Sequence, residues 1–376
     1  MDWRALMEVG GNEGLDLWEE EAMEGDQVQQ SMDFETKMGC ESRGLGGVLD
    51  FIRKDPIGVT IKPASLCPPA VAAGSASGLS SSRWALLDLK AYIADRPNAS
   101  TAKDFTRAGH EIQATLCFAR QPRVSHLCVH CPALTPRDFG REPTILAACD
   151  GFIFFNAAIC NVSVCYEQAI QDFFVYRVPL SRMEGRPSLT RLPHPGPSRY
   201  IRSSMVGLVR CSDDSEDMDG DYSSGCTLRP HGIAQQHYVI ATLRRSEGSR
   251  DYSQFDLHRF DSRKGQWITE VLQLGPMEPS PSLTFFCHHT HKVITLGGGF
   301  MGWVDLCRGI LFCNVLVDHP ELHYIPLPVS PEANEEIRED SADAFRDIAV
   351  VQDYIKYVEH HTEVEPWSYR NGTYVS

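Results

Sequence analysis

Short runs rich in β-branched and aromatic residues, each of roughly four to eight positions, follow one another from about Trp84 to the C-terminus. Gly, Pro, Asn, Asp and Ser separate these runs, and several alternate apolar with polar positions, as half-buried strands do. Helical periodicity is scarce, and its best case lies between Pro331 and Ile348. The pattern predicts an all-β body. The expected strands are 84–89, 114–118, 124–131, 152–155, 173–178, 237–243, 255–260, 267–272, 292–296, 310–317, 323–327 and 354–358.

Many short strands of this kind are typical of a sandwich, a barrel or a propeller. The segment 83–376 is too long for one sandwich of about 100 residues. A propeller-like arrangement of short antiparallel sheets is therefore the economical prediction, although the chain shows no clean internal repeat.

The first 82 residues differ from this body. Residues 1–50 carry thirteen acidic and three basic side chains, so they hold −10 of the formal net charge of −15. Residues 63–82 are rich in Pro, Ala, Ser and Gly, and such a stretch cannot bury enough apolar surface to offset its ordering entropy. We expect a disordered acidic tail and linker over residues 1–82 and a β-rich domain over 83–376.

Charge and cysteine content limit the possible partners and compartments. The body is nearly neutral and offers no Lys/Arg-rich face, so we expect no nucleic-acid partner and no anionic membrane surface. Thirteen cysteines is an odd number, and no secretory signal precedes them. No apolar run approaches the roughly 20 residues that cross a bilayer. The prediction is a soluble protein of the cytoplasm or nucleus, with free thiols.

The block that starts Trp303-Val-Asp-Leu-Cys-Arg-Gly and continues through His319-Pro-Glu-Leu-His to Val329 resembles the signature of a plant family, the domain of unknown function 1618, which is expanded in grasses. Weaker similarities extend the resemblance over roughly residues 83–376. It implies a mostly β, propeller-like domain without an established activity, cofactor or catalytic residue. Similar proteins commonly continue beyond the position of Ser376, so we expect a domain truncated at its C-terminus. The supporting segments are 83–88, 124–132, 174–177, 187–193, 345–351 and 355–359.

The residues of this signature block also have a structural interpretation. Asp305 and Arg308 are spaced to pair across a turn, and Gly309 permits a turn or a bulge. Proline is confined to strand ends or edges. We therefore expect a packing role for the signature residues, which are Trp303, Asp305, Arg308, Gly309, Pro320, Glu321 and Leu322.

The segment Gly297–Gly302 matches the G-x-G-x-x-G pattern of dinucleotide sites. Such a site needs a helix directly afterwards, whose N-terminus binds the pyrophosphate. A β-like block follows instead, so the prediction is a glycine-rich hairpin loop.

Zinc is the best-supported metal hypothesis. Cys128 and Cys131 have C-x-x-C spacing, and zinc accepts four thiolate or imidazole ligands in a tetrahedron. Against it, these two cysteines lie in an alternating strand and are expected to face opposite sides of a sheet. Buried thiols and surface histidines are the simpler expectation. The remaining candidate ligands are Cys287, His288, His289 and His291.

Other chemistry has little support. The acidic segment 213–221 departs from the EF-hand pattern, and a solvated acidic loop is expected there. No segment of the sequence fits the nucleophile-elbow motif or the zinc-protease motif. We expect no catalytic residue and no cofactor.

Two functional hypotheses remain. The first is a non-enzymatic module that binds an unknown protein partner through loops on a β scaffold. The alternative is a metal- or ligand-dependent enzyme with a central pocket, which requires Cys128 and Cys131 to converge with two of the three histidines. A third possibility is a marginally folded product of the early chain end.

Overall fold

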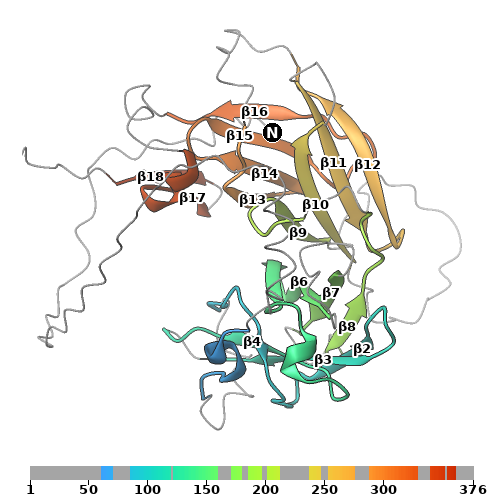
Figure 1. The fold of residues 1–376 in the computed structure, drawn as a ribbon. Coiled ribbons are helices and arrows are strands. Elements are labelled where there is room, and N and C mark those ends of the chain that lie inside the picture. Colours follow the sequence, from blue (N-terminus) through green and yellow to red (C-terminus); the bar gives the residue numbers. More distant parts are fainter. Residues whose placement is uncertain are drawn as a thin grey trace, which may run out of the picture.

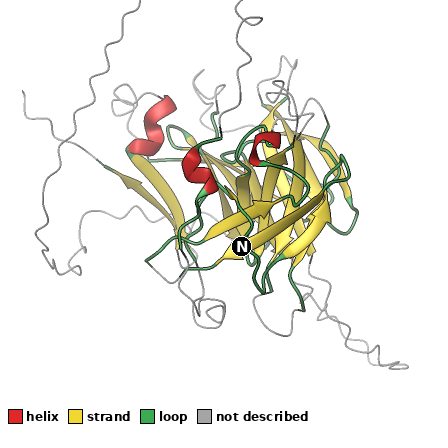
Figure 2. Cartoon of the chain, turned by 60° about the horizontal axis from the view of Figure 1, so that its bottom comes forward, coloured by secondary structure: helices red, strands yellow, loops and turns green. Residues whose placement is uncertain are grey.

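The computed structural model describes residues 61–70, 85–119, 122–159, 171–179, 185–196, 201–211, 237–246, 253–275, 288–328, 339–351 and 354–360. Within these ranges the chain forms strands and short 3-10 helices, so the all-β prediction is confirmed. Figure 2 shows the strands packed together, with the short helices on the outside. None of the helices in the described part is long and apolar enough to cross a membrane.

Five small sheets follow one another along the chain. The first has the order β1-β4-β3-β2, with β1 parallel to β4. The second, third and fourth are antiparallel and keep their strands in sequence order or its reverse, and the fifth has two strands. The bounds of the strands in the first and second sheets are β1 Tyr92–Ile93, β2 Ala102–Phe105, β3 Glu111–Cys117, β4 His126–His130, β5 Thr144–Cys149, β6 Phe152–Ala158, β7 Gln171–Arg177 and β8 Ser188–Arg191.

The later sheets repeat the hairpin-connected plan of the second. Long antiparallel pairings join β10 to both β9 and β11, and β14 to both β13 and β15. Their bounds are β9 Val206–Cys211, β10 His237–Arg245, β11 Gln254–Asp261 and β12 Gln266–Gln273 in the third sheet, β13 Lys292–Gly297, β14 Phe300–Asp305, β15 Gly309–Asn314 and β16 His323–Pro326 in the fourth, and β17 Arg346–Val351 and β18 Tyr354–Glu359 in the fifth.

The apolar core is divided among the interfaces between successive sheets. Four clusters of buried residues join the first sheet to the second, the second to the third, the third to the fourth, and the fourth to the fifth. In β10, Val239 packs toward the fourth sheet while its neighbour Ile240 packs toward the second. Because the middle sheets are buried on both faces, their strands read as continuous apolar runs.

The sheets form an arc, seen in Figure 1 from β2–β4 at the bottom through β9–β12 to β17 and β18. From the second sheet onward, the first strand of each sheet lies next to the first strand of the following one: β5 contacts β9, β9 contacts β13, and β13 contacts β17. The outer strand β8 of the second sheet contacts β2 of the first. Neighbouring sheets are therefore stacked in a consistent direction.

Two segments differ from the sequence-based expectation. Residues 61–70 lie in the stretch expected to be disordered, yet they form a 3-10 helix (η2, Pro63–Leu66), and Ile61 packs against the first core cluster. The Lys62 amide and the Ser65 hydroxyl both donate to Oε1 of Glu142, at 3.0 and 3.1 Å. The rest of the 1–82 stretch, residues 1–60 and 71–82, lies outside the described residues.

The segment with the best helical periodicity is the second case. Its described part is a 3-10 helix (η8, Glu339–Ala344) followed directly by strand β17. Arg346 of β17 pairs with Glu359 of β18, and Ile348 is buried against the fourth sheet. An apolar contact with a neighbouring sheet thus decides the conformation here over local periodicity.

Candidate functional site

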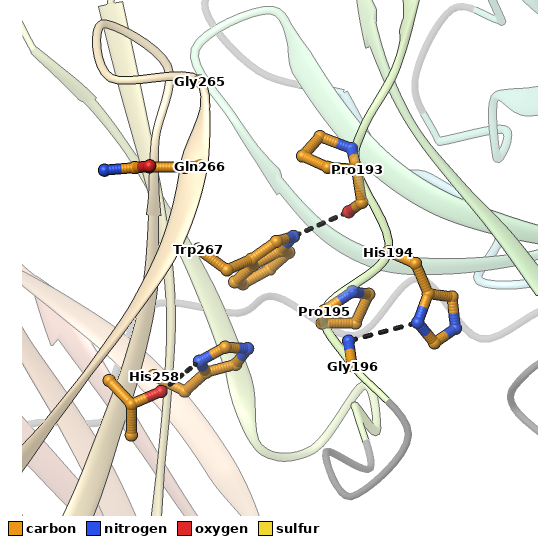
Figure 3. A pocket seen from close by; sticks show the side chains of 9 residues that line it. Pro193, His194, Pro195, Gly196, His258, Gly265, Gln266 and Trp267 are labelled. Carbon is orange, nitrogen blue, oxygen red and sulfur yellow. Dashed lines mark hydrogen bonds between the residues drawn. The ribbon is translucent and has the colours of Figure 1, made fainter.

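A pocket of about 310 Å³ lies between the segment that follows β8 and the strands β11 and β12 (Figure 3). The core cluster between the second and third sheets holds the two sides together, because Leu192 and Phe260 are both buried in it. The residues that line the pocket are Pro193, His194, Pro195, Gly196, His258, Gly265, Gln266, Trp267 and Thr269.

Trp267 is fixed in this pocket from two sides. Its indole Nε1 donates to the carbonyl oxygen of Pro193 at 2.8 Å, and its ring stacks on His258 with centroids 4.7 Å apart and planes 17° apart. His258 Nδ1 is in turn 3.0 Å from the hydroxyl of Thr269. Figure 3 shows the indole projecting from β12 toward the prolines. The ring therefore presents a rigid apolar surface to the pocket.

The opposite wall is ordered by His194. Its Nδ1 accepts a hydrogen bond from the Gly196 amide at 3.1 Å, and its ring packs edge-on against Phe173 at 5.9 Å. The described lining residues include two imidazoles but no carboxylate and no thiol. The prolines and Trp267 offer apolar and aromatic surface to a bound group.

The signature residues Asp305 and Arg308 meet as the sequence predicts, in the tight turn between β14 and β15. The Asp305 carboxylate is fully buried and accepts from Arg308 Nη1 at 3.0 Å, from the Cys307 amide at 2.9 Å and from the His289 amide at 2.8 Å. Three charge-assisted bonds satisfy this carboxylate. Its role is to fix the turn and to attach the segment before β13.

The other signature residues are distributed around the same sheet. Trp303 is fully buried and donates from Nε1 to the Met205 carbonyl at 3.0 Å, across to the third sheet. Leu322 is buried and forms an isolated bridge with Leu274. Pro320 is buried and Glu321 is exposed, just before β16.

Gly309 has a different role from the one the sequence suggests. It is the first residue of β15, its φ angle is not positive, and it pairs with Pro326 of β16. A Cβ atom at Gly309 would lie 2.4 Å from the carbonyl oxygen of Ile325 and 2.5 Å from the Tyr324 ring. Close approach of β16, and not a turn or bulge, requires glycine here. By contrast, Gly297, Gly298 and Gly299 all have positive φ between β13 and β14, which confirms the hairpin loop.

Near Asp305, His288 and His291 are less exposed than expected, whereas His289 is exposed. Both ring nitrogens of His288 are buried, and burial lowers its pKa to about 4, while the Asp305 carboxylate opposes that shift. The Nδ1 of His291 accepts from the Leu306 amide at 3.2 Å and lies 4.0 Å from Asp305 Oδ1. The His289 ring lies 4.7 Å from that of His291, centroid to centroid. These rings surround the turn of the fourth sheet.

The predicted zinc ligands do not converge. Cys131 is buried in the core between the first and second sheets, whereas Cys128 lies on the other face of the first sheet, which confirms their opposite orientation. The three histidines lie in the segment just before β13, around Asp305 of the fourth sheet. Cys287, like the acidic segment 213–221, lies outside the described residues.

Cys128 instead meets two residues that sequence reasoning missed. Its sulfur lies 3.7 Å from that of Cys117, and the ligand atoms of Cys117, His126 and Cys128 all lie within 4.8 Å of one another. Cys117 on β3 pairs directly with His126 on β4. The available signal was the alternation of the runs 114–118 and 124–131, combined with their pairing as a hairpin.

Residues 303–374 match the model of a family described as Protein of unknown function (DUF1618). No curated protein and no solved structure matches the chain. The matched segment starts at Trp303 in β14 and includes the Asp305 turn, strands β15 and β16 of the fourth sheet, and both strands of the fifth. Over this segment, the chain is similar to the DUF1618 family of proteins of unknown function.

Proposed function

We propose that this protein is a non-enzymatic protein-interaction module, and that it binds an extended segment of a cytoplasmic or nuclear partner protein in the pocket between residues 193–196 and strands β11 and β12. The observation that carries this proposal is the fixed Trp267 ring in an open pocket. Tryptophan is enriched among the residues that dominate binding energy at protein interfaces. A ring already held in place loses little entropy on binding.

The size and lining of the pocket favour a peptide over a metabolite. Its volume of about 310 Å³ lies at the low end of the roughly 300–1,000 Å³ typical of small-molecule sites. An open pocket of this size accommodates one or two side chains of a longer ligand. With two prolines and Trp267 in the lining, an apolar or aromatic side chain is the best occupant.

The arrangement of the sheets supports a propeller-like scaffold as part of this proposal. Successive contacts among the first strands β5, β9, β13 and β17 are those expected when the first strand of each blade lies nearest a common axis. The shared cores between successive sheets fit the same plan. Such a scaffold holds connecting segments, including 192–196, on a rigid base.

Selection from a displayed peptide library on the purified full-length chain tests this proposal. We expect selected peptides to share an apolar or aromatic residue and to lose affinity by roughly 10-fold or more for Trp267→Ala. His194→Ala, on the opposite wall, should also weaken binding. Val271→Ala is the matched control, because Val271 lies on the same strand, is 63% exposed and does not line the pocket.

Circular dichroism of each variant separates loss of binding from loss of folding. Peptides that bind the folded Trp267→Ala and His194→Ala variants as tightly as the unsubstituted chain would place the interaction elsewhere. A library that yields no specific binder to the folded chain would also contradict the proposal.

A further inference from the structure

The first sheet brings two thiols and one imidazole to a single buried position. Cys117 ends β3, His126 begins β4 opposite it, and Cys128 follows two residues later. Residues directly opposite in an antiparallel pair share a face, and so do residues two apart in a strand. The three side chains therefore project from the same face, away from the core shared with the second sheet.

The spacing of these groups fits one metal ion. Two sulfur ligands bound to zinc at about 2.3 Å with a tetrahedral angle lie about 3.8 Å apart. The sulfurs of Cys117 and Cys128 are 3.7 Å apart, and the nearest ligand atom of His126 lies within 4.8 Å of both. Closing this triangle on zinc requires only a small movement of the imidazole.

His126 gives an independent indication of a missing ligand. The residue is 3% exposed, and neither of its ring nitrogens has a hydrogen-bond partner among the described residues. A buried polar group left unsatisfied carries an uncompensated desolvation cost. The Tyr92 ring packs edge-on against the imidazole at 5.0 Å and offers it no polar atom, since its hydroxyl is directed to Asp88 at 3.4 Å. A metal bond to one nitrogen would remove part of this cost.

The two thiols share a proton across this gap, because either sulfur can donate to the other at 3.7 Å. Zinc displaces such a shared proton on binding, since it takes cysteine as the thiolate.

We propose that Cys117, His126 and Cys128 form a zinc-binding site with two thiolates and one imidazole, and that a solvent molecule or another small donor completes the tetrahedron. Two thiolates balance the charge of the ion, so the buried site is neutral as a whole. A disulfide between the two cysteines would account for the short sulfur distance but would leave the imidazole unsatisfied. Zinc accounts for all three residues.

Metal analysis of the full-length chain tests the site. After incubation with zinc and dialysis, we expect about one bound zinc ion per chain, in line with a single three-ligand site. Replacing zinc by Co²⁺ should produce a sulfur-to-cobalt charge-transfer band and the strong visible bands of a tetrahedral ion. Cys117→Ser, Cys128→Ser and His126→Gln should each lose the bound ion.

Cys131→Ser is the matched control, because Cys131 is 1% exposed and close in sequence but faces the opposite core. It should keep the zinc and the cobalt spectrum. On the unsubstituted chain, alkylation followed by mass spectrometry should find Cys117 and Cys128 protected until a chelator is added. This measurement does not depend on the folding of any variant.

Three results would overturn the proposal. The first is a folded chain that binds no zinc, and the second is zinc that persists in the folded Cys128→Ser variant. The third is a Cys117–Cys128 disulfide in protein prepared without reductant. Peptide binding at Trp267 is measured separately, so either proposal can fail alone.

Discussion

His288 links the stability of the fourth sheet to pH. Burial of its ring lowers the pKa from 6.5 to about 4, and Arg308, His291 and His289 act in the same direction, against Asp305. Between these two values the unfolded chain binds more protons than the folded one, so the free energy of unfolding falls as the pH falls from 6.5 to 4. The loss should be on the order of 2 kcal/mol.

Urea unfolding across this pH range measures the effect. His288→Asn removes the titrating group and should abolish most of this loss of unfolding free energy. His319→Asn, at an exposed position, should leave the pH dependence unchanged. An unaltered slope in the His288 variant would show that the ring is protonated in the folded protein without cost.

At the residue scale, sequence reasoning succeeded where the partners are close in the chain. The spacing of Asp305 and Arg308 was enough to predict their ion pair, and alternation was enough to predict that Cys128 and Cys131 diverge. It missed Cys117 as a neighbour of Cys128, because that contact depends on the register of β3 against β4. Register is set by burial of one face of the sheet, which no local motif records.

The packing of β16 against β15 depends on the missing side chain of Gly309. A Cβ atom there would meet the backbone oxygen of Ile325 at 2.4 Å, and a strand backbone cannot move aside as a flexible side chain can. Gly309→Ala should therefore destabilise the protein by about 1–3 kcal/mol. Gly275→Ala is the control, because nothing lies within 4 Å of its added Cβ, and it should change stability by less than about 0.5 kcal/mol.

Thermal or urea unfolding of the two variants makes the comparison. Equal stability of Gly309→Ala and Gly275→Ala would mean that β16 shifts outward at little cost, and that the fourth sheet tolerates a looser outer edge.

At the element scale, strands buried on both faces were the ones the pattern revealed. The core strands β6, β7, β10 and β15 read as long apolar runs. The short strands β2 and β8, with one buried residue each, carry mostly polar side chains and gave no signal. The helix indicated by the periodicity before Ile348 was wrong for β17, because contact with the fourth sheet outweighs local preference there.

At the scale of the whole molecule, strand-rich composition predicted a set of small sheets but not their connections. The parallel pairing of β1 with β4 in the first sheet could not be read from the chain, because it joins segments on either side of a hairpin. The interfaces differ in their residues, for example Phe154 in one and Leu257 in another, so the repeated architecture leaves no repeated sequence.

Serial stacking of the sheets should also make their stabilities separable. Core residues are shared only between successive sheets in the described part of the chain, and the two-stranded fifth sheet packs against the fourth. Ile348, 1% exposed, anchors it there. In arrays with nearest-neighbour contacts, terminal units open before the rest. Ile348→Ala should therefore speed amide hydrogen exchange in β17 and β18 while the first and second sheets keep their protection.

Leu127→Ala, at the other end of the array, provides the matched comparison. Leu127 is fully buried between the first and second sheets, so its truncation should speed exchange there and leave β17 and β18 as they were. A uniform rise in exchange across all five sheets for both variants would show instead that the molecule opens as one cooperative unit. Local opening would be compatible with a scaffold in which the central second, third and fourth sheets stay closed around the Trp267 pocket while the ends fluctuate.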